Sequence, residues 1–283
     1  MTFFCGIYGY EITEVMSFNG ITFTPKYYGG PEARQYPRDT RTYHLTAIAE
    51  MEVYDHSLLF DLEGILAFIE RLDVLISLPV ESHNLDVQGA FLEFPAEIRL
   101  HERNNGGGCV IPGGIISKNA RCRFITAAMS RLSDAEFCKK TEFRGAFFKC
   151  VETFRSPKSF LDVSYYFLFS ALESFARGTY SDYTSDAAVP INRLLQEYGF
   201  NIKIANALNL KRAISTYAHI RNALFHTGKL EAEINLNGRA TLLKLTDYYG
   251  SFSNLLPLVM MKAVGFDDSH INWDGWAEGG TFL

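Results

Sequence analysis

The 283-residue sequence lacks an apolar segment that could cross a membrane, and it has no excess of positive charge. Its most apolar stretch, residues 62–79, carries Glu63, Glu70, Arg71 and Asp73, and a bilayer would exclude these charges. The formal net charge is −5, so the chain as a whole is not an electrostatic nucleic-acid binder. Contact with a nucleic acid would require a local basic patch.

Cysteine is scarce and shows no metal-binding or disulfide pattern. The five cysteines are an odd number without CxxC spacing, and they stand at Cys5, Cys109, Cys122, Cys138 and Cys150. Neither a disulfide framework nor structural zinc is therefore predicted. The first residues, MTFFCGIYGYEI, also lack the basic start and long apolar run of a signal peptide. We expect a cytoplasmic protein with reduced thiols and no membrane contact.

The composition is that of a globular protein with a surplus of aromatic residues. Hydrophobic residues make up 47% of the chain and charged residues 21%, which excludes a disordered chain. Aromatic residues reach 14%, which indicates a wide core or an interface in addition to the core.

The fold class predicted for the chain is α+β, with a mixed α/β domain over residues 1–130. Residues 42–54 are rich in strand-forming residues, and residues 89–101 are typical of an extended edge segment interrupted by proline. Between them, residues 62–78 have the spacing of an amphipathic helix that ends at Pro79.

Residues 131–283 are predicted to form an α-helical bundle with one small β-hairpin. The sequence SDAE at Ser133–Glu136 is a capping box that would open a helix reaching about Phe154. Ser156–Pro157 and Gly178 bracket a second helix, with Gly178 as its left-handed C-terminal residue. Further elements are a short helix ending at Gly199, a long helix over 202–226, a hairpin around Asn237–Gly238 and a helix over 247–264.

The segment YAHIRNALFHTGKL, Tyr217 to Leu230, carries the residues best suited to chemistry. On a helix, one side would face a core, and it carries Leu210, Ile214, Tyr217, Ile220 or Arg221, and Leu224. Another side, a sector of roughly 60°, carries Ser215, His219, Asn222 and His226. Two histidines and an asparagine without an acidic neighbour suit proton transfer. The structural alternative is that a histidine near a helix end is stabilised by the helix dipole, and that an asparagine hydrogen-bonds in the core.

The hexapeptide RNALFH, Arg221–His226, resembles the motif of the HEPN superfamily, in which four to six residues separate an Arg from a His and a polar residue follows the Arg. The helix YYFLFSALESFAR, Tyr165–Arg177, looks like the ALE helix of the ApeA-like branch of antiphage HEPN proteins. The glycine of HTGKL is also similar. The resemblance covers roughly residues 135–265, and the first half of the chain is only loosely similar to the variable N-terminal domains of that branch.

The resemblance implies a metal-independent endoribonuclease that cleaves RNA by attack of the 2′-hydroxyl and needs no cofactor. His226 would act as general base or acid, and Arg221 would hold the phosphate with a permanently charged planar fork. Asn222 would orient the imidazole or the phosphate. Glu173 and His219 are weaker candidates for supporting roles, and Lys211, Arg212 and Lys229 for RNA contacts.

One geometric requirement follows from the spacing of the motif. Five residues along an ideal helix turn Arg221 and His226 roughly 140° apart, so one copy would not direct both at one phosphate unless the helix ended early. In the family that the motif resembles, two motif helices meet and each site draws on both copies. A homodimer or higher homo-oligomer through this helix is therefore part of the prediction.

Several alternatives remain open from the sequence. The chain could bind RNA or serve as a scaffold without cutting. It could be the toxin of a toxin–antitoxin pair. In the pairs that it resembles, a Tyr two residues after the His is modified, whereas this position is Gly228 here. A hydrolase using Cys138 or Cys150 lacks a partnered histidine. By resemblance, the setting is prokaryotic defence against phage by abortive infection, with a phage-derived trigger or a regulatory partner.

Overall fold

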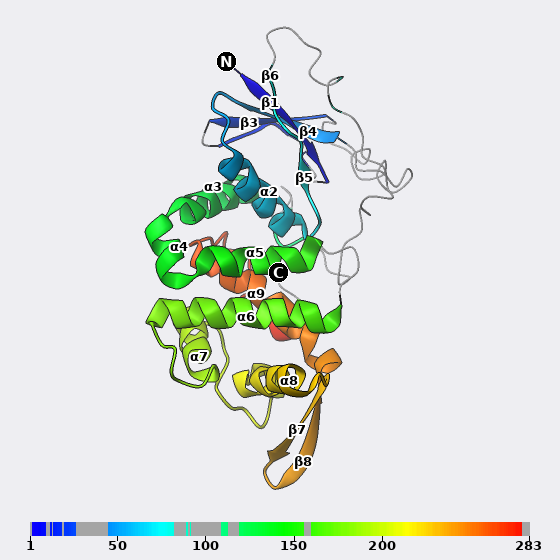
Figure 1. Ribbon diagram of the computed structural model, residues 1–283, viewed down its shortest axis with the longest axis vertical. Coiled ribbons are helices and arrows are strands. Elements are labelled where there is room, and N and C mark those ends of the chain that lie inside the picture. The colour runs from blue at the N-terminus through cyan, green and yellow to red at the C-terminus, as the bar shows by residue number, and fades with distance from the viewer. Residues whose placement is uncertain are drawn as a thin grey trace. The chain divides into compact units, whose positions relative to one another are not determined.

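The computed structural model describes residues 2–9, 12, 14–18, 20–26, 45–81, 89, 91, 109–112, 119–155 and 160–278. The chain forms two compact units. Unit 1 comprises Met1–Ser130 with Phe154–Lys158, and unit 2 comprises Arg131–Thr153 with Ser159–Leu283. The predicted mixture of helices and strands is confirmed at this level (Figure 1).

Unit 1 contains an antiparallel sheet in the order β2-β3-β4-β1-β5, with β6 also paired to β1. Its strands are β1 (Phe3–Tyr8), β2 (Met16–Phe18), β3 (Ile21–Pro25), β4 (Leu45–Met51), β5 (Leu75–Ile76) and β6 (Val80–Glu81). The strand predicted over 42–54 is confirmed by β4, where apolar residues are buried on both faces of the sheet. Of the edge segment predicted over 89–101, all but Gly89 and Phe91 lies outside the described residues.

The helix predicted over 62–78 is wrong at both ends, because α2 spans His56–Glu70. The Asp55 side chain caps its start by accepting a hydrogen bond from the Ser57 N–H at 2.8 Å. Arg71 takes the left-handed conformation and ends it, and Leu75–Ile76 then pair with β1. A continuous apolar run does not distinguish a buried helix from a buried strand, which is why the spacing misled.

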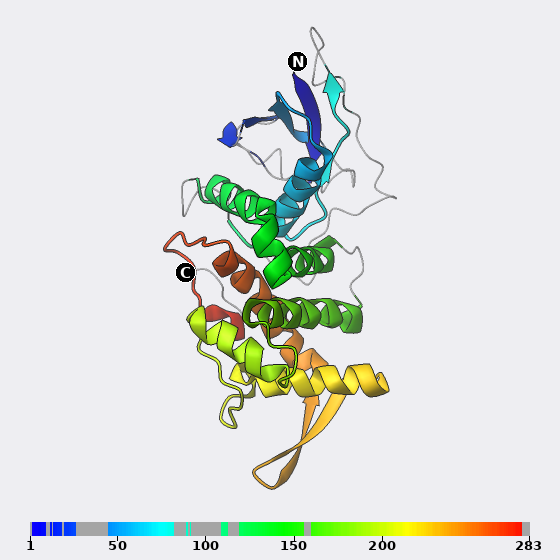
Figure 2. The same cartoon turned by 60° about the vertical axis from the view of Figure 1, so that its left-hand side comes forward.

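The remaining elements are helical except for one hairpin. They are α3 (Ala120–Ser133), α4 (Ala135–Thr141), α5 (Phe143–Arg155), α6 (Leu161–Tyr180), α7 (Ala188–Glu197), η3 (Leu210–Arg212), α8 (Ile214–Thr227), β7 (Glu231–Leu236), β8 (Arg239–Lys244), α9 (Leu245–Ala263) and η4 (Gly275–Ala277). Within unit 2, α6 packs against α4, α7, α8 and α9. The hairpin β7–β8 projects away from these helices in both views (Figure 2).

The capping box predicted at Ser133–Glu136 is corrected by the structure. Ser133 is the last residue of α3, and the N-cap of α4 is Asp134, whose carboxylate accepts a hydrogen bond from the Phe137 N–H at 2.9 Å. Glu142 is left-handed, so the single helix expected to reach Phe154 is two helices, α4 and α5.

Gly178 is a packing residue and not the C-terminal residue of its helix. It lies inside α6, which ends at Tyr180 with Ser181 as its left-handed cap. A Cβ on Gly178 would stand 2.7–2.9 Å from backbone atoms of Thr141. Glycine therefore allows α4 and α6 to approach closely, a requirement that depends on a distant segment. The predicted start of this helix, Ser156–Pro157, lies outside the described residues.

The long helix predicted over 202–226 is wrong in its first half. Lys203 and Ala213 form a parallel bridge, in which the Lys203 N–H donates to the Arg212 carbonyl at 3.1 Å. The Asn206 side chain accepts from the N–H groups of Leu208 and Asn209, as asparagine does in turns. These bonds satisfy the backbone without a helix, and α8 begins only at Ile214.

Four other predictions for unit 2 are confirmed. α8 ends at Thr227 with Gly228 in the left-handed conformation. Asn237 and Gly238 both have positive φ and form the two-residue turn between β7 and β8. The helix expected over 247–264 is α9, and the short helix that was to end at Gly199 is α7. Among the described residues, no helix is long and apolar enough to cross a membrane.

Candidate functional site

The first half of α8 is held in the core of unit 2. The Tyr217 ring stacks on Phe252 of α9 with 4.8 Å between centroids, and the Tyr165 hydroxyl of α6 donates to the Tyr217 carbonyl at 2.6 Å. Burial raises the pKa of both tyrosines, so their hydroxyls remain neutral donors. These contacts fix α8 against α6 and α9.

The second half of α8 leaves the core. Residues 221–224 are half-buried and residues 225–227 are exposed, whereas Ile214, Tyr217 and Ile220 are buried. The helix is nevertheless anchored beyond this half. The Leu245 N–H donates to the Leu230 carbonyl at 2.8 Å, which closes the base of the hairpin that follows.

Arg221 is the first residue of the second half and has four partners within unit 2. Its guanidinium forms an ion pair with Glu173 of α6 and donates to the Asn222 side-chain oxygen at 2.9 Å. Its central carbon stands 5.0 Å from the Phe169 ring centroid and 5.7 Å from that of Phe225. The Arg221 side chain is still 23% exposed, and the remaining N–H donors of its guanidinium have no partner among the described residues.

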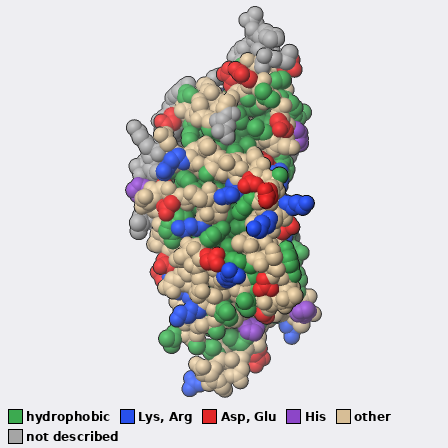
Figure 3. Space-filling model, turned by 90° about the vertical axis from the view of Figure 1, so that its left-hand side faces the viewer, with side chains coloured by type: hydrophobic (Ala, Val, Ile, Leu, Met, Phe, Trp, Pro, Cys, Tyr) green, Lys and Arg blue, Asp and Glu red, His purple; other side chains and the backbone are tan. Residues whose placement is uncertain are grey.

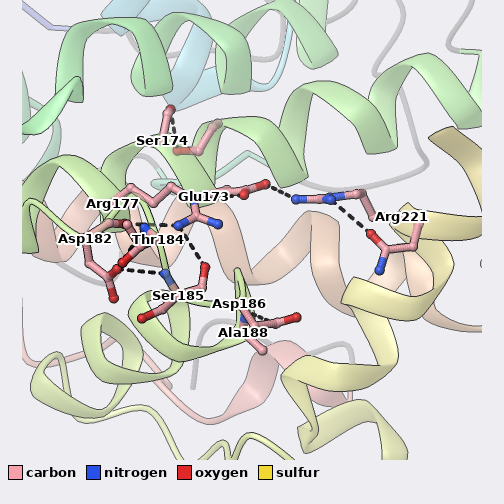
Figure 4. Close-up of polar contacts among 11 residues, drawn as sticks. Glu173, Ser174, Arg177, Asp182, Thr184, Ser185, Asp186, Ala188 and Arg221 are labelled. Atoms are coloured by element: carbon pink, nitrogen blue, oxygen red, sulfur yellow. Dashed lines mark hydrogen bonds and ion pairs between the residues drawn. The ribbon is translucent and has the colours of Figure 1, made fainter. Parts of the chain in front are cut away.

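Glu173 connects Arg221 to the loop that follows α6. Its other oxygen accepts from Arg177 Nε at 3.0 Å, and Arg177 Nη1 donates to the carbonyls of Asp182 and Ser185 at 3.0 and 3.1 Å (Figure 4). Backbone hydrogen bonds from Ser185, and then from Thr184, lower the pKa of Asp182. One carboxylate is therefore shared by two arginines, each bound to a different part of unit 2.

An open groove of about 190 Å³ lies beside this network. It is lined by Tyr166, Phe169, Ser170, Glu173, Arg221 and Phe225. The rings of Tyr166 and Phe225 meet edge-to-face, with 5.0 Å between centroids and an interplanar angle of 62°. The groove therefore combines aromatic rings with one guanidinium and one carboxylate.

The structure brings together Arg221, Asn222 and Glu173 of the predicted residues, whereas His226 and His219 of the same helix hydrogen-bond to none of them. Both histidines are exposed, make no hydrogen bond or ion pair within the part of the chain that is described, and do not line the groove. Because α8 stays helical to Thr227, Arg221 and His226 remain roughly 140° apart around its axis.

The three basic residues predicted to contact RNA differ in their surroundings. Lys211 and Lys229 are exposed. The Arg212 side chain is only 12% exposed, because it donates to the Asn201 carbonyl and to Asp274, each at 3.0 Å. Arg212 thus ties Asp274, in the C-terminal segment of unit 2, to the segment that precedes α8. On the face drawn in Figure 3, cationic and anionic side chains are interspersed and form no basic patch of one sign.

Other chemistries have little support in the described residues. No three His, Cys, Asp or Glu side chains there come close enough together to hold a metal ion. The five cysteines are free thiols. Cys150 is fully buried, and the Cys138 thiol donates to the Arg131 carbonyl at 3.4 Å. A hydrolase using Cys150 would have no access to its substrate.

Sequence reasoning missed the aromatic groove, although a signal for it exists. Tyr166, Ser170, Glu173 and Arg177 follow one another at i, i+4, i+7 and i+11, which places them on one side of α6. Phe225 stands four residues after Arg221, one turn along the same side of α8. That these two sides meet is information that only the tertiary structure holds.

No protein-family model matches the chain, and neither a curated protein nor a solved structure matches it. What the site can do is set by its own side chains. They offer a partly exposed guanidinium with spare donors, exposed imidazoles nearby on the same helix, and a groove with aromatic walls.

Proposed function

We propose that this protein is a metal-independent endoribonuclease of the HEPN type. The observation that carries the proposal is the placement of Arg221, whose guanidinium is held by Glu173 and Asn222 at the wall of an open groove and keeps N–H donors for a phosphate. A planar fork of donors suits the phosphate oxygens of RNA and the negative charge that grows on them during cleavage.

In the proposed reaction, an imidazole removes the proton of the 2′-hydroxyl, and its oxygen attacks the adjacent phosphorus. The bond from phosphorus to the 5′-oxygen breaks, and that oxygen takes a proton. The products carry a 2′,3′-cyclic phosphate and a 5′-hydroxyl. His226 is the exposed imidazole assigned to proton transfer, which is typically worth about 10²–10⁴ in rate.

The proposal includes a homodimer, because Arg221 and His226 of one copy point in different directions. Two copies joined along the second half of α8 would let each site draw Arg221 from one copy and His226 from the other. Exposed apolar residues just beyond this half, Leu230 and Leu242, supply surface for such an interface. The biological setting rests on resemblance alone: cytoplasmic RNA cleavage in antiphage defence, with unit 1 sensing a trigger or selecting the substrate.

The test is induced expression of the wild type beside Arg221→Ala and His226→Ala, scoring growth and the integrity of total RNA. Arg193→Ala and His270→Ala are matched controls, since both residues are exposed and lie away from the groove lining. We expect cleavage by the wild type and by both controls, cleavage lost in the two motif variants, and no effect of EDTA on the purified enzyme. Cleavage that survives both motif substitutions would overturn the assignment.

A second candidate is a HEPN-like protein that binds RNA or assembles without cutting. The observation favouring it is that Arg221 is already paired with Glu173 and packed against two rings, while no described side chain orients His226. For this candidate, purified wild type bound to RNA would leave it intact under every condition in which the dimer forms.

A further inference from the structure

The groove beside Arg221 combines two recognition chemistries in one place. The side chains of Tyr166 and Phe225 are 42% and 48% exposed, so their rings are open to a ligand. Arg221 stands against the Phe225 ring and has N–H donors to spare. A ligand that satisfies both features carries a flat ring and, a few ångströms away, an anionic group.

The size of the groove limits what can enter it. Its volume of about 190 Å³ is smaller than the roughly 300–1,000 Å³ of sites for drug-sized ligands. The space therefore suits a single ring system. Aromatic side chains stack on any nucleobase, because every base has a π-face.

We propose that Tyr166, Phe225 and Arg221 form a nucleobase-binding subsite for single-stranded RNA. One unpaired base stacks on the aromatic rings, and Arg221 contacts the adjoining phosphate. Glu173 acts as a positioning residue that holds Arg221 at the wall of the groove. The inference rests on the proposed function and deepens it, since a paired base in a duplex cannot enter such a groove.

The N–H donors in the groove favour RNA over a second copy of the chain as its occupant. Arg221 keeps N–H donors beyond those that bind Glu173 and Asn222. An apolar surface of another copy would bury these donors without a new partner, and this is unfavourable. A phosphate accepts hydrogen bonds from them directly.

The test uses the full chain with His226→Ala as the parent, so that binding is measured without cleavage. Fluorescence anisotropy follows a labelled single-stranded oligoribonucleotide and an abasic oligomer of the same length. Tyr166→Phe keeps the ring and should bind like the parent, whereas Tyr166→Leu keeps apolar bulk and should weaken binding by roughly five- to a hundredfold. Tyr183→Ala is the matched control, since Tyr183 is 67% exposed and lies outside the groove lining.

The abasic oligomer should bind the parent and Tyr166→Leu equally, because it offers no ring to stack. Equal binding of the base-containing oligomer by Tyr166→Leu and the parent overturns the subsite, even where the wild type cleaves RNA. If RNA binding depends on Tyr166 but the wild type does not cleave RNA, the subsite is supported and the proposed ribonuclease activity is refuted. A change of oligomeric state in Tyr166→Leu with unchanged RNA affinity overturns the inference in favour of a contact between copies.

Discussion

The first half of α8 lies in the core of unit 2, whereas its second half carries exposed aromatic and polar groups. In the first half, Tyr217 stacks on Phe252 and accepts a hydrogen bond from Tyr165. In the second half, Arg221 reaches across to Glu173, and Phe225 and His226 are exposed. One helix therefore joins a segment that builds the fold to a segment available for binding and chemistry.

The contrast teaches that the candidate site is anchored from two sides although it lies near a surface. Beyond the exposed half, Gly228 ends the helix in a left-handed turn and the hairpin closes behind it. Arg221 is fixed from α6 as well as from its own helix. Substitutions in the first half should change stability, and substitutions in the second half should change activity.

The largest expected effect is that of Tyr217→Ala in the first half of α8. Loss of the buried ring leaves a cavity beside Phe252 and should lower the free energy of unfolding by about 3–5 kcal/mol. Urea unfolding followed by circular dichroism measures it. Tyr217→Phe keeps the ring and loses only the bond to the Lys211 carbonyl, so it should lose about 1 kcal/mol. A small effect of Tyr217→Ala would contradict the division of α8 into two halves.

His226→Ala in the second half should reverse this pattern. We expect a fall in the rate of RNA cleavage by about 10²–10⁴, with the unfolding free energy changed by no more than about 0.5 kcal/mol. Cleavage of a short labelled RNA and thermal unfolding of the same preparation measure the two effects. If His226→Ala destabilises the protein as Tyr217→Ala does, the imidazole has a structural role and the proposed role fails.

The features that the sequence predicted well are those with a local cause. The turn at Asn237–Gly238 follows from two adjacent residues that tolerate positive φ, and the end of α8 follows from Gly228. The motif residues Arg221 and Asn222 were singled out by their resemblance to a family motif. Their mutual hydrogen bond is also a local contact, but the prediction did not include it.

The features that the sequence predicted poorly depend on distant segments. Glycine is a residue type typical of a helix end, yet the role of Gly178 is set by the backbone of Thr141. The groove forms only because α6 and α8 meet, which brings Tyr166 against Phe225. Helical spacing indicates which residues share one side of a helix, but it does not indicate what that side contacts.

Glu173→Gln is an intermediate case, because Glu173 contacts both Arg221 and the loop after α6. Glutamine keeps the shape but not the charge, so two partly buried arginines lose their anion, and stability should fall by roughly 1–3 kcal/mol. RNA cleavage should fall as well, since Arg221 is no longer held at the groove wall. Glu136→Gln, on the exposed face of α4, is the matched control in both assays. Normal cleavage by Glu173→Gln would show that Arg221 needs no positioning by α6.

The smallest expected effect concerns Asp182, at the far end of the same network. Hydrogen bonds from Ser185 and Thr184 lower its pKa in the folded state, so its carboxylate contributes stability that is fully present above the unfolded pKa near 3.8. That contribution is lost as the pH falls through the lower, folded pKa. Asp182→Asn should therefore flatten the acid limb of the stability curve below about pH 4. Arg177 joins this loop to Glu173 and so to Arg221. If protonation of Asp182 lowers stability without altering RNA binding at Arg221, the network between them serves the fold and not the binding site.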